Sequence, residues 1–196
     1  MSLPQRVLAF GDSMIEASTW PLVGKDLRWW SWINCGRAGL RTRQYLDYWR
    51  TNLAGLDWGD TALISGSVIH LGTNDYWCPR DDPGYATLRD DLITLVGLAR
   101  RVGQGRVALC VPLSLEPGFS HTSDALARVP EITRVRDAIL DAARISGPAV
   151  IDIGGKFRGA DLLALPGMTQ DGVHYSPTGA PIAHEFIGAR LAATFV

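Results

Sequence analysis

The stretch RVLAFGDSM, residues 6–14, passes from a mainly apolar run into a polar turn. The run at 6–10 does not alternate between apolar and polar residues, which is typical of a parallel strand that is buried on both faces. Gly11 lets the chain turn sharply where the run ends. The stretch therefore predicts a buried strand that presents Ser13 at its carboxyl end.

Four more short apolar runs follow this stretch, and helical patterns separate them. They predict strands at 31–35, 61–71, 106–111 and 149–153, and the sequence leaves open whether the second of these is broken at Gly66. About five strands that alternate with helices predict an α/β protein, built as an open three-layer α/β/α sandwich with a parallel sheet. In such sheets the functional residues gather beyond the carboxyl ends of the strands.

Capping signals predict where the helices begin and end. Asp82-Pro83 combines an N-cap residue with a proline at the first helical position, and this helix is expected to end near Gly103. Another helix follows Pro130 and has Gly147 beyond its end. The remaining two are a helix capped by Thr42 that runs to about Leu53, and a last helix that follows Ser176-Pro177 and runs to about Ala193.

The composition is that of a globular protein. The chain has 196 residues, enough for one domain over residues 1–196 with a sizeable core. Its formal net charge is -1, so electrostatics do not favour a nucleic acid or an anionic membrane as a partner. The sequence shows neither a membrane-spanning run nor a signal-peptide pattern, so we expect a cytoplasmic location. Cys35, Cys78 and Cys110 are too few for a disulfide framework and are expected to be buried thiols.

Two segments carry candidate catalytic residues. Ser13 lies at a predicted helix start, where its own N–H could hold a developing oxyanion, although a helix cap explains the residue as well. Asp171 and His174 lie in the loop before the last predicted helix. The aspartate could orient the imidazole so that its other ring nitrogen accepts the proton of a serine. A turn aspartate and a surface histidine would also explain this pair.

Two glycine-containing turns supply further candidates. The segment Gly72-Thr-Asn-Asp follows the third predicted strand, and the amide of Asn74 could donate to an oxyanion there. The segment Asn34-Cys-Gly-Arg-Ala-Gly follows the second strand, and Gly39 could offer a backbone N–H that no side chain blocks. Each segment could be an ordinary turn, so the functional interpretation rests on all four occurring in order at the appropriate places.

Together these segments resemble the four sequence blocks of the SGNH/GDSL family of serine hydrolases. The blocks are FGDS at 10–13, NCGRAG at 34–39, GTND at 72–75 and DGVH at 171–174, so the resemblance covers essentially the whole chain. It implies a flavodoxin-like sheet in an α/β/α fold. It also implies an enzyme that cleaves carboxylic esters and needs neither a metal nor an organic cofactor.

The resemblance assigns a role to each candidate. Ser13 would be the nucleophile, His174 the general base and Asp171 the residue that orients it. The oxyanion hole would consist of the Ser13 N–H, the Gly39 N–H and the Asn74 side chain. Two details are less regular: the first block reads GDSM rather than GDSL, and Gly36 competes with Gly39, which the family pattern favours. The stretch 113–128 carries no family motif, and we expect it to determine specificity.

Tyr76 and Trp77 directly follow the third block and are candidate walls of the substrate pocket, although core packing would also explain them. Because tryptophan faces are common platforms for sugars, we expect a small-molecule or carbohydrate ester as substrate, with a short acyl group such as O-acetyl. The alternatives are lysophospholipase or thioesterase activity, acyl transfer by the same triad, and a binding module without catalysis. The sequence does not indicate an oligomeric state.

Overall fold

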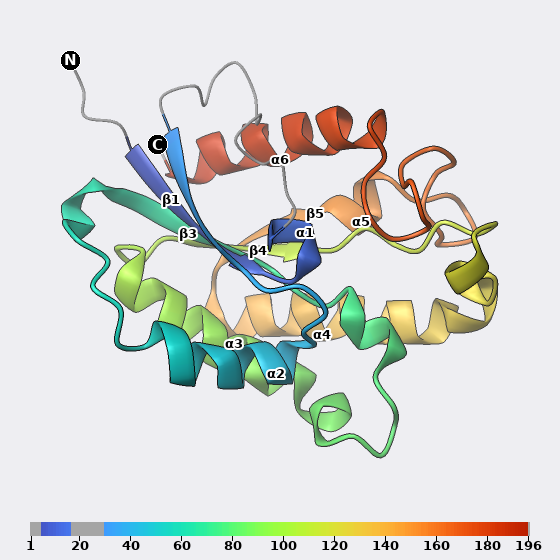
Figure 1. Ribbon diagram of the computed structural model, residues 1–196, viewed down its shortest axis with the longest axis horizontal. Coiled ribbons are helices and arrows are strands. Elements are labelled where there is room, and N and C mark those ends of the chain that lie inside the picture. The colour runs from blue at the N-terminus through green and yellow to red at the C-terminus, as the bar shows by residue number, and fades with distance from the viewer. Residues whose placement is uncertain (1–4, 17–29, 196) are drawn as a thin grey trace.

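The computed structural model describes residues 5–16 and 30–195, which form a parallel sheet between two layers of helices (Figure 1). The strands have the spatial order β2-β1-β3-β4-β5, and all neighbouring pairs are parallel. This is the flavodoxin-like order, which confirms the expected fold class. The strands are β1 (Gln5–Gly11), β2 (Trp30–Gly36), β3 (Ile64–His70), β4 (Val107–Val111) and β5 (Ala149–Asp152).

The helices divide between the two faces of the sheet. The long helices α3 and α4 cover one face together with α2, and α6 lies on the opposite face (Figure 1). The short helices α1 and α5 directly follow β1 and β5. The helices are α1 (Ser13–Glu16), α2 (Thr42–Tyr48), α3 (Pro83–Val102), α4 (Val129–Ser146), α5 (Ile153–Lys156) and α6 (Gly179–Phe195).

Two apolar clusters hold the layers together, one on each face. In β1, Leu8 and Phe10 belong to the cluster under α2, α3 and α4, whereas Val7 and Ala9 belong to the cluster under α6. All four side chains are at most 2% exposed, as expected for a strand with helices on both faces. Burying a side chain the size of Leu or Phe stabilises the fold by about 1.5–3 kcal/mol, so this strand anchors the sheet.

The third strand is not broken at Gly66. Residues Thr61–Leu63 form a single 3-10 turn capped by Asp60, and the strand begins after it at Ile64. Gly66 lies inside the strand, where a Cβ atom would come within 2.8 Å of the Phe195 ring at the end of α6. The glycine is therefore explained by close packing of a helix on the strand and not by a break.

The cap predicted at Thr42 is wrong by one residue. Arg41 is the N-cap of α2, and Thr42 is its first helical residue. Both the backbone N–H and the hydroxyl of Thr42 donate to the Asp75 carboxylate, at 3.0 and 2.8 Å. A π-helical turn, Trp49–Leu53, continues α2 to its predicted end. Thr42 thus fixes the start of α2 to the turn after β3.

The other helix signals are close to the observed boundaries. Asp82 caps α3 through its hydrogen bond from the Gly84 N–H at 2.8 Å, and Gly147 ends α4 with a left-handed backbone. The last helix begins at Gly179. Ser176 lies before its first turn, and the Ser176 hydroxyl accepts the Gly179 N–H at 2.8 Å. It ends at Phe195, two residues beyond the predicted Ala193.

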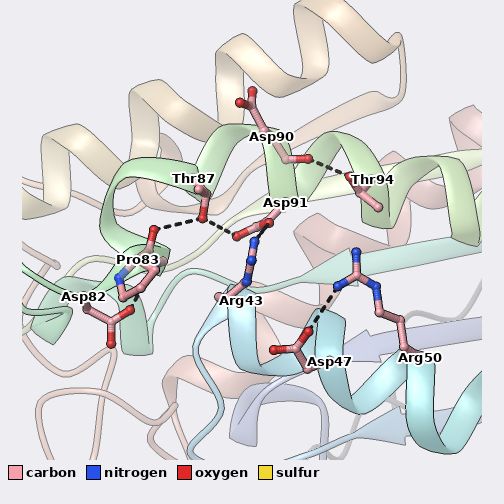
Figure 2. Close-up of polar contacts among 10 residues, drawn as sticks. Arg43, Asp47, Arg50, Asp82, Pro83, Thr87, Asp90, Asp91 and Thr94 are labelled. Carbon is pink, nitrogen blue, oxygen red and sulfur yellow. Dashed lines mark hydrogen bonds and ion pairs between the residues drawn. The ribbon is translucent and has the colours of Figure 1, made fainter.

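Figure 2 shows the polar contacts that join α2 to α3. Arg43 reaches from α2 to the carboxylate of Asp91 on α3, at 2.7 Å, and the Thr87 hydroxyl donates to the same carboxylate. Asp91 is 4% exposed, so its charge is screened little by solvent. This contact orients α2 on α3 and therefore also the loop that leads into α2.

Three smaller expectations concern the rest of the chain. The three cysteines are buried and unpaired, as predicted. Among the described residues, no helix is long and apolar enough to cross a membrane. Residues 1–4, part of the segment in which we expect no signal peptide, lie outside the described residues.

Candidate active site

Ser13 is held at the turn between β1 and α1, at the carboxyl edge of the sheet. Gly11 makes the turn possible, because a Cβ there would collide with the His70 carbonyl oxygen and the Ile15 side chain. Asp12 accepts the Met14 N–H at 3.0 Å. Since Ser13 is the first residue of the helix, its own N–H has no partner within that helix, and none is found elsewhere among residues 5–16 and 30–195.

His174 joins Ser13 to Asp171 by two hydrogen bonds. Its Nε2 lies 2.9 Å from Ser13 Oγ, and its Nδ1 lies 2.7 Å from Asp171 Oδ2. The side chains of His174 and Asp171 are 38% and 32% exposed, so the group is open to a substrate. The structure thus brings these three residues together, although Ser13 and His174 are 161 positions apart in the sequence.

The Asp171 carboxylate is held in its ionised form. Partial burial disfavours the charge, but hydrogen bonds from the His174 ring and from the backbone N–H groups of His174 and Val173 outweigh it. The pKa of Asp171 is therefore below its usual range. An ionised carboxylate on Nδ1 fixes the tautomer that leaves Nε2 free to accept a proton from Ser13.

The structure distinguishes Gly39 from Gly36. The Gly36 N–H donates to Asn34 Oδ1 at 2.9 Å, and a Cβ on Gly36 would collide with the backbone of α1. Gly39 has a φ of 74°, lies in an exposed turn with open space around it, and its N–H makes no hydrogen bond within the described residues. Gly36 is thus a packing residue, and Gly39 is the one with a free donor.

Asn74 is tied to the same turn. Its Nδ2 donates to the carbonyl of Leu40, the residue after Gly39, at 3.0 Å. Because a side-chain amide has two N–H donors, one remains for another acceptor. Asn74 and Gly39 therefore lie on neighbouring loops that follow β3 and β2, on either side of β1 and Ser13.

Asp12 is a feature of this site that the sequence patterns do not reveal. It is fully buried, and burial raises its pKa to about 7. Its Oδ2 faces the hydroxyl of Thr73, and neither atom has a hydrogen bond of ordinary geometry within the described residues. A proton on this carboxyl would let it donate to Thr73, the neighbour of Asn74.

The two aromatic candidates lie in different environments. Tyr76 is 2% exposed, and its hydroxyl donates to the Leu113 carbonyl at 3.2 Å. It packs in the core and also lines a small pocket beside Ile132, so its role in a substrate pocket stays a prediction. Trp77 is partly exposed, with the Arg128 guanidinium 5.4 Å from its ring centre. Trp77 is the more accessible of the two candidates for substrate contact.

The arrangement can activate a hydroxyl group. Within residues 5–16 and 30–195, no group of three or more His, Cys, Asp or Glu side chains is placed to hold a metal ion. A serine hydroxyl hydrogen-bonded to an oriented imidazole can attack a carbonyl carbon, and nearby N–H groups can stabilise the oxyanion that results.

The structure combines a three-layer α/β/α fold with a hydrogen-bonded Ser–His–Asp group beyond the carboxyl ends of the strands. It is thus an α/β protein with a candidate serine nucleophile. The sequence matches the GDSL-like Lipase/Acylhydrolase family over residues 9–181, which include all four sequence blocks. The protein therefore belongs to this family. Comparison with curated proteins found no match.

Solved structures share the fold of this chain. The chain is similar to a lipase/acylhydrolase from Enterococcus faecalis, with 21% identity, a TM-score of 0.70, and 96% of each chain covered. It is similar to a GDSL-like lipase from Bacteroides thetaiotaomicron, with 19% identity and a TM-score of 0.68, over 98% of this chain and 93% of the other. A carbohydrate acetylesterase from Sinorhizobium meliloti has 19% identity and a TM-score of 0.67, over 97% of this chain and 100% of the other. Identities this low show a common fold.

Proposed function

We propose that the protein is a serine hydrolase that cleaves carboxylic esters through an acyl-enzyme. The observation that carries this proposal is the pair of hydrogen bonds from Ser13 Oγ to His174 Nε2, at 2.9 Å, and from His174 Nδ1 to Asp171, at 2.7 Å. Ser13 is the nucleophile, His174 the general base and Asp171 the residue that orients His174. Membership of a family of lipases and acylhydrolases supports the same reaction class.

In the first half-reaction, Ser13 Oγ attacks the ester carbonyl carbon while His174 Nε2 takes the hydroxyl proton. The carbonyl oxygen becomes an oxyanion, which the N–H groups of Ser13 and Gly39 and the free N–H of Asn74 stabilise. His174 then gives its proton to the leaving alcohol, and the acyl group stays on Ser13.

In the second half-reaction, water takes the place of the alcohol. His174 removes a proton from the water, which attacks the acyl carbon, and the same three donors hold the second oxyanion. Collapse releases the carboxylic acid and returns the proton to Ser13. The partial exposure of the Asp171 and His174 side chains is compatible with access by water.

We infer a short-acyl ester as the substrate, with an O-acetyl group on a carbohydrate as the first candidate. The partly exposed Trp77 next to the third block supports a sugar, because indole faces stack on sugar rings. The similarity to a carbohydrate acetylesterase is in keeping with it. A single domain over residues 1–196 and a cytoplasmic location stay predictions from the sequence.

The test is hydrolysis of p-nitrophenyl acetate, butyrate and octanoate and of acetylated xylan by the wild-type protein and Ser13→Ala. Release from the acetate and the xylan that depends on Ser13 is expected. A preference for octanoate would favour the lipid esterase alternative instead. Transfer of the acyl group to an added alcohol in place of hydrolysis would identify an acyltransferase.

A fluorophosphonate probe that reacts with activated serines separates an enzyme from a binding module. The wild-type protein is expected to be labelled and Ser13→Ala is not. If neither protein reacts and no ester is cleaved, the proposed function is wrong.

A further inference from the structure

The loop that carries Asp171 and His174 has almost no regular structure. Between α5 and α6 its only strand-like pairings are two isolated bridges, Arg158 with Ala164 and Thr169 with Tyr175. Turn-type backbone bonds, such as Gln170 N–H to the His174 carbonyl at 2.9 Å, hold the loop internally. Catalysis by such a group also requires its side chains to be positioned relative to Ser13 to within a few tenths of an ångström, so contacts with the rest of the chain must fix where the loop lies.

Glu116 provides these contacts from the segment after β4. It is 7% exposed, and its two carboxylate oxygens face the loop. Oε1 accepts the Gly167 N–H at 2.7 Å. Oε2 accepts both the N–H and the hydroxyl of Thr169, at 2.7 and 2.8 Å. All three bonds are short, and together they occupy both oxygens of the carboxyl group.

The contacts of Glu116 extend to the catalytic turn itself. The hydroxyl of Thr169, while it donates to Glu116, accepts the N–H of Gly172 at 3.0 Å. The backbone N–H of Glu116 donates to the carbonyl of the same glycine at 2.9 Å. The N–H of Gly172 is thus linked to Glu116 through the Thr169 hydroxyl, and the Gly172 carbonyl is bonded to Glu116 directly. Because Gly172 directly follows Asp171, these bonds hold the backbone next to that residue.

Thr122 packs directly against Gly172. The Thr122 hydroxyl donates to the Glu116 carbonyl at 2.7 Å. A Cβ on Gly172, whose φ is 92°, would collide with that hydroxyl. The turn can therefore sit against Glu116 only because residue 172 has no side chain.

We propose that Glu116 is a positioning residue for the reaction, which holds the Asp171–His174 turn in register with Ser13. The proposal rests on the proposed function, because it assigns Glu116 to the same catalytic group. Glu116 acts through Thr169 and Gly172 and does not itself contact the substrate. Part of the stretch 113–128, expected to determine specificity, thus serves to hold the catalytic loop.

The matched variants are Glu116→Gln and Thr169→Val. An amide of the same size keeps one acceptor but directs its NH2 group at N–H and O–H donors of the loop. Valine has the shape of threonine and keeps the backbone N–H bond to Glu116, but its side chain can neither donate to Glu116 nor accept from Gly172. Thr169→Ser restores the hydroxyl, and Glu185→Gln removes a carboxylate from an exposed position of α6 as a charge control.

The first readout is the steady-state rate of p-nitrophenyl acetate hydrolysis. We expect Glu116→Gln and Thr169→Val to lower kcat about 10- to 100-fold with KM nearly unchanged, as displacement of a catalytic group does. Thr169→Ser is expected to recover most of the lost kcat, and Glu185→Gln to match the wild-type protein. Circular dichroism checks that each variant is folded under the assay conditions.

The second readout does not depend on turnover. The proton on His174 Nδ1, in its 2.7 Å bond to Asp171, is expected to give a low-field proton NMR signal in the wild-type protein. The signal should move or vanish in Glu116→Gln and Thr169→Val and return in Thr169→Ser. If the wild-type protein cleaves no ester, the proposed function fails, while this signal still reports whether Glu116 positions the pair.

Two results would overturn the proposal. One is a kcat within about twofold of wild type in folded Thr169→Val and Glu116→Gln, together with an unchanged NMR signal. The other is a loss of kcat that merely follows the fraction of unfolded protein, which would assign Glu116 to stability alone. If Glu116→Gln does not fold, Thr169→Val decides between these outcomes.

Discussion

Asn74 donates one N–H of its side-chain amide to the carbonyl of Leu40, at 3.0 Å, and keeps the other N–H for a ligand. The bond orients the amide, because only its nitrogen can face a carbonyl oxygen. It also joins the turn after β3 to the turn that contains Gly39. Asn74 and Gly39 are two of the proposed donors of the oxyanion hole. This bond therefore fixes their loops relative to each other.

Removal of this amide tests its proposed role. Asn74→Ala should lower kcat about 10²- to 10³-fold, the usual cost of losing one oxyanion donor. Asn74→Asp should be at least as impaired, because a carboxylate would repel both the Leu40 carbonyl and an oxyanion. Single-turnover acylation with p-nitrophenyl acetate measures the effect. Acylation by Asn74→Ala at the wild-type rate would exclude Asn74 from the oxyanion hole.

Substitutions of the proposed triad should cost most. Ser13→Ala and His174→Ala should each lower kcat at least about 10³-fold, and the double variant should be hardly worse than either, because the residues act as a unit. Asp171→Asn should lose most activity with the fold retained. Full activity of Asp171→Asn would mean that another acid orients His174.

Asp12 should make stability depend on pH. Burial raises its pKa to about 7 in the folded protein, whereas the unfolded chain has the ordinary value of 3.8. The folded state therefore binds this proton more tightly. Stability from this group is fully present below about pH 4 and is lost as the pH rises to about 7. At 1.36 kcal/mol per pKa unit, the loss is at most about 4 kcal/mol.

Asp12→Asn should remove this dependence. The amide can still accept the Met14 N–H and can donate to Thr73 as a protonated carboxyl would. Urea denaturation measures the free energy of unfolding of both proteins. Asp12→Asn should exceed the wild-type value by more at pH 8 than at pH 4. An equal difference at both values would show that Asp12 ionises normally.

Two glycines of the scaffold should respond in opposite directions. Gly66→Ala places a methyl group within 2.8 Å of the Phe195 ring and should destabilise the protein by about 1–3 kcal/mol, as overpacking does. Gly97→Ala lies in α3 with open space around it and should stabilise by up to about 1 kcal/mol. Thermal unfolding of both variants measures the contrast. A Gly66→Ala variant as stable as wild type would show that α6 shifts to accept the methyl group.

The sequence predicts those features that depend on neighbouring residues. Asp82 caps α3 through a residue two positions away, so its pattern is visible in the local sequence. Buried strands such as Val107–Val111 are recognisable because both faces are apolar. The four blocks identify the residues of the candidate site for the same reason, since each block is a short local motif.

Features that depend on distant partners are not visible in this way. Thr42 looks like a cap, but its hydroxyl bonds to Asp75, 33 residues later. The neighbours of Tyr76 in the sequence give no sign that its hydroxyl bonds to the Leu113 carbonyl, 37 residues later. Glu116 belongs to no motif, because its donors come from residues 51 and 53 positions further along the chain. Only the folded arrangement brings these partners together.

The bond between Ser13 and His174 joins residues 161 positions apart, near the two ends of the described chain. During synthesis, Ser13 therefore leaves the ribosome 161 residues before its partner. A nascent chain or an amino-terminal fragment that stops short of residue 174 therefore holds a serine without a base. Esterase activity, once measured, would report on completion of the whole fold.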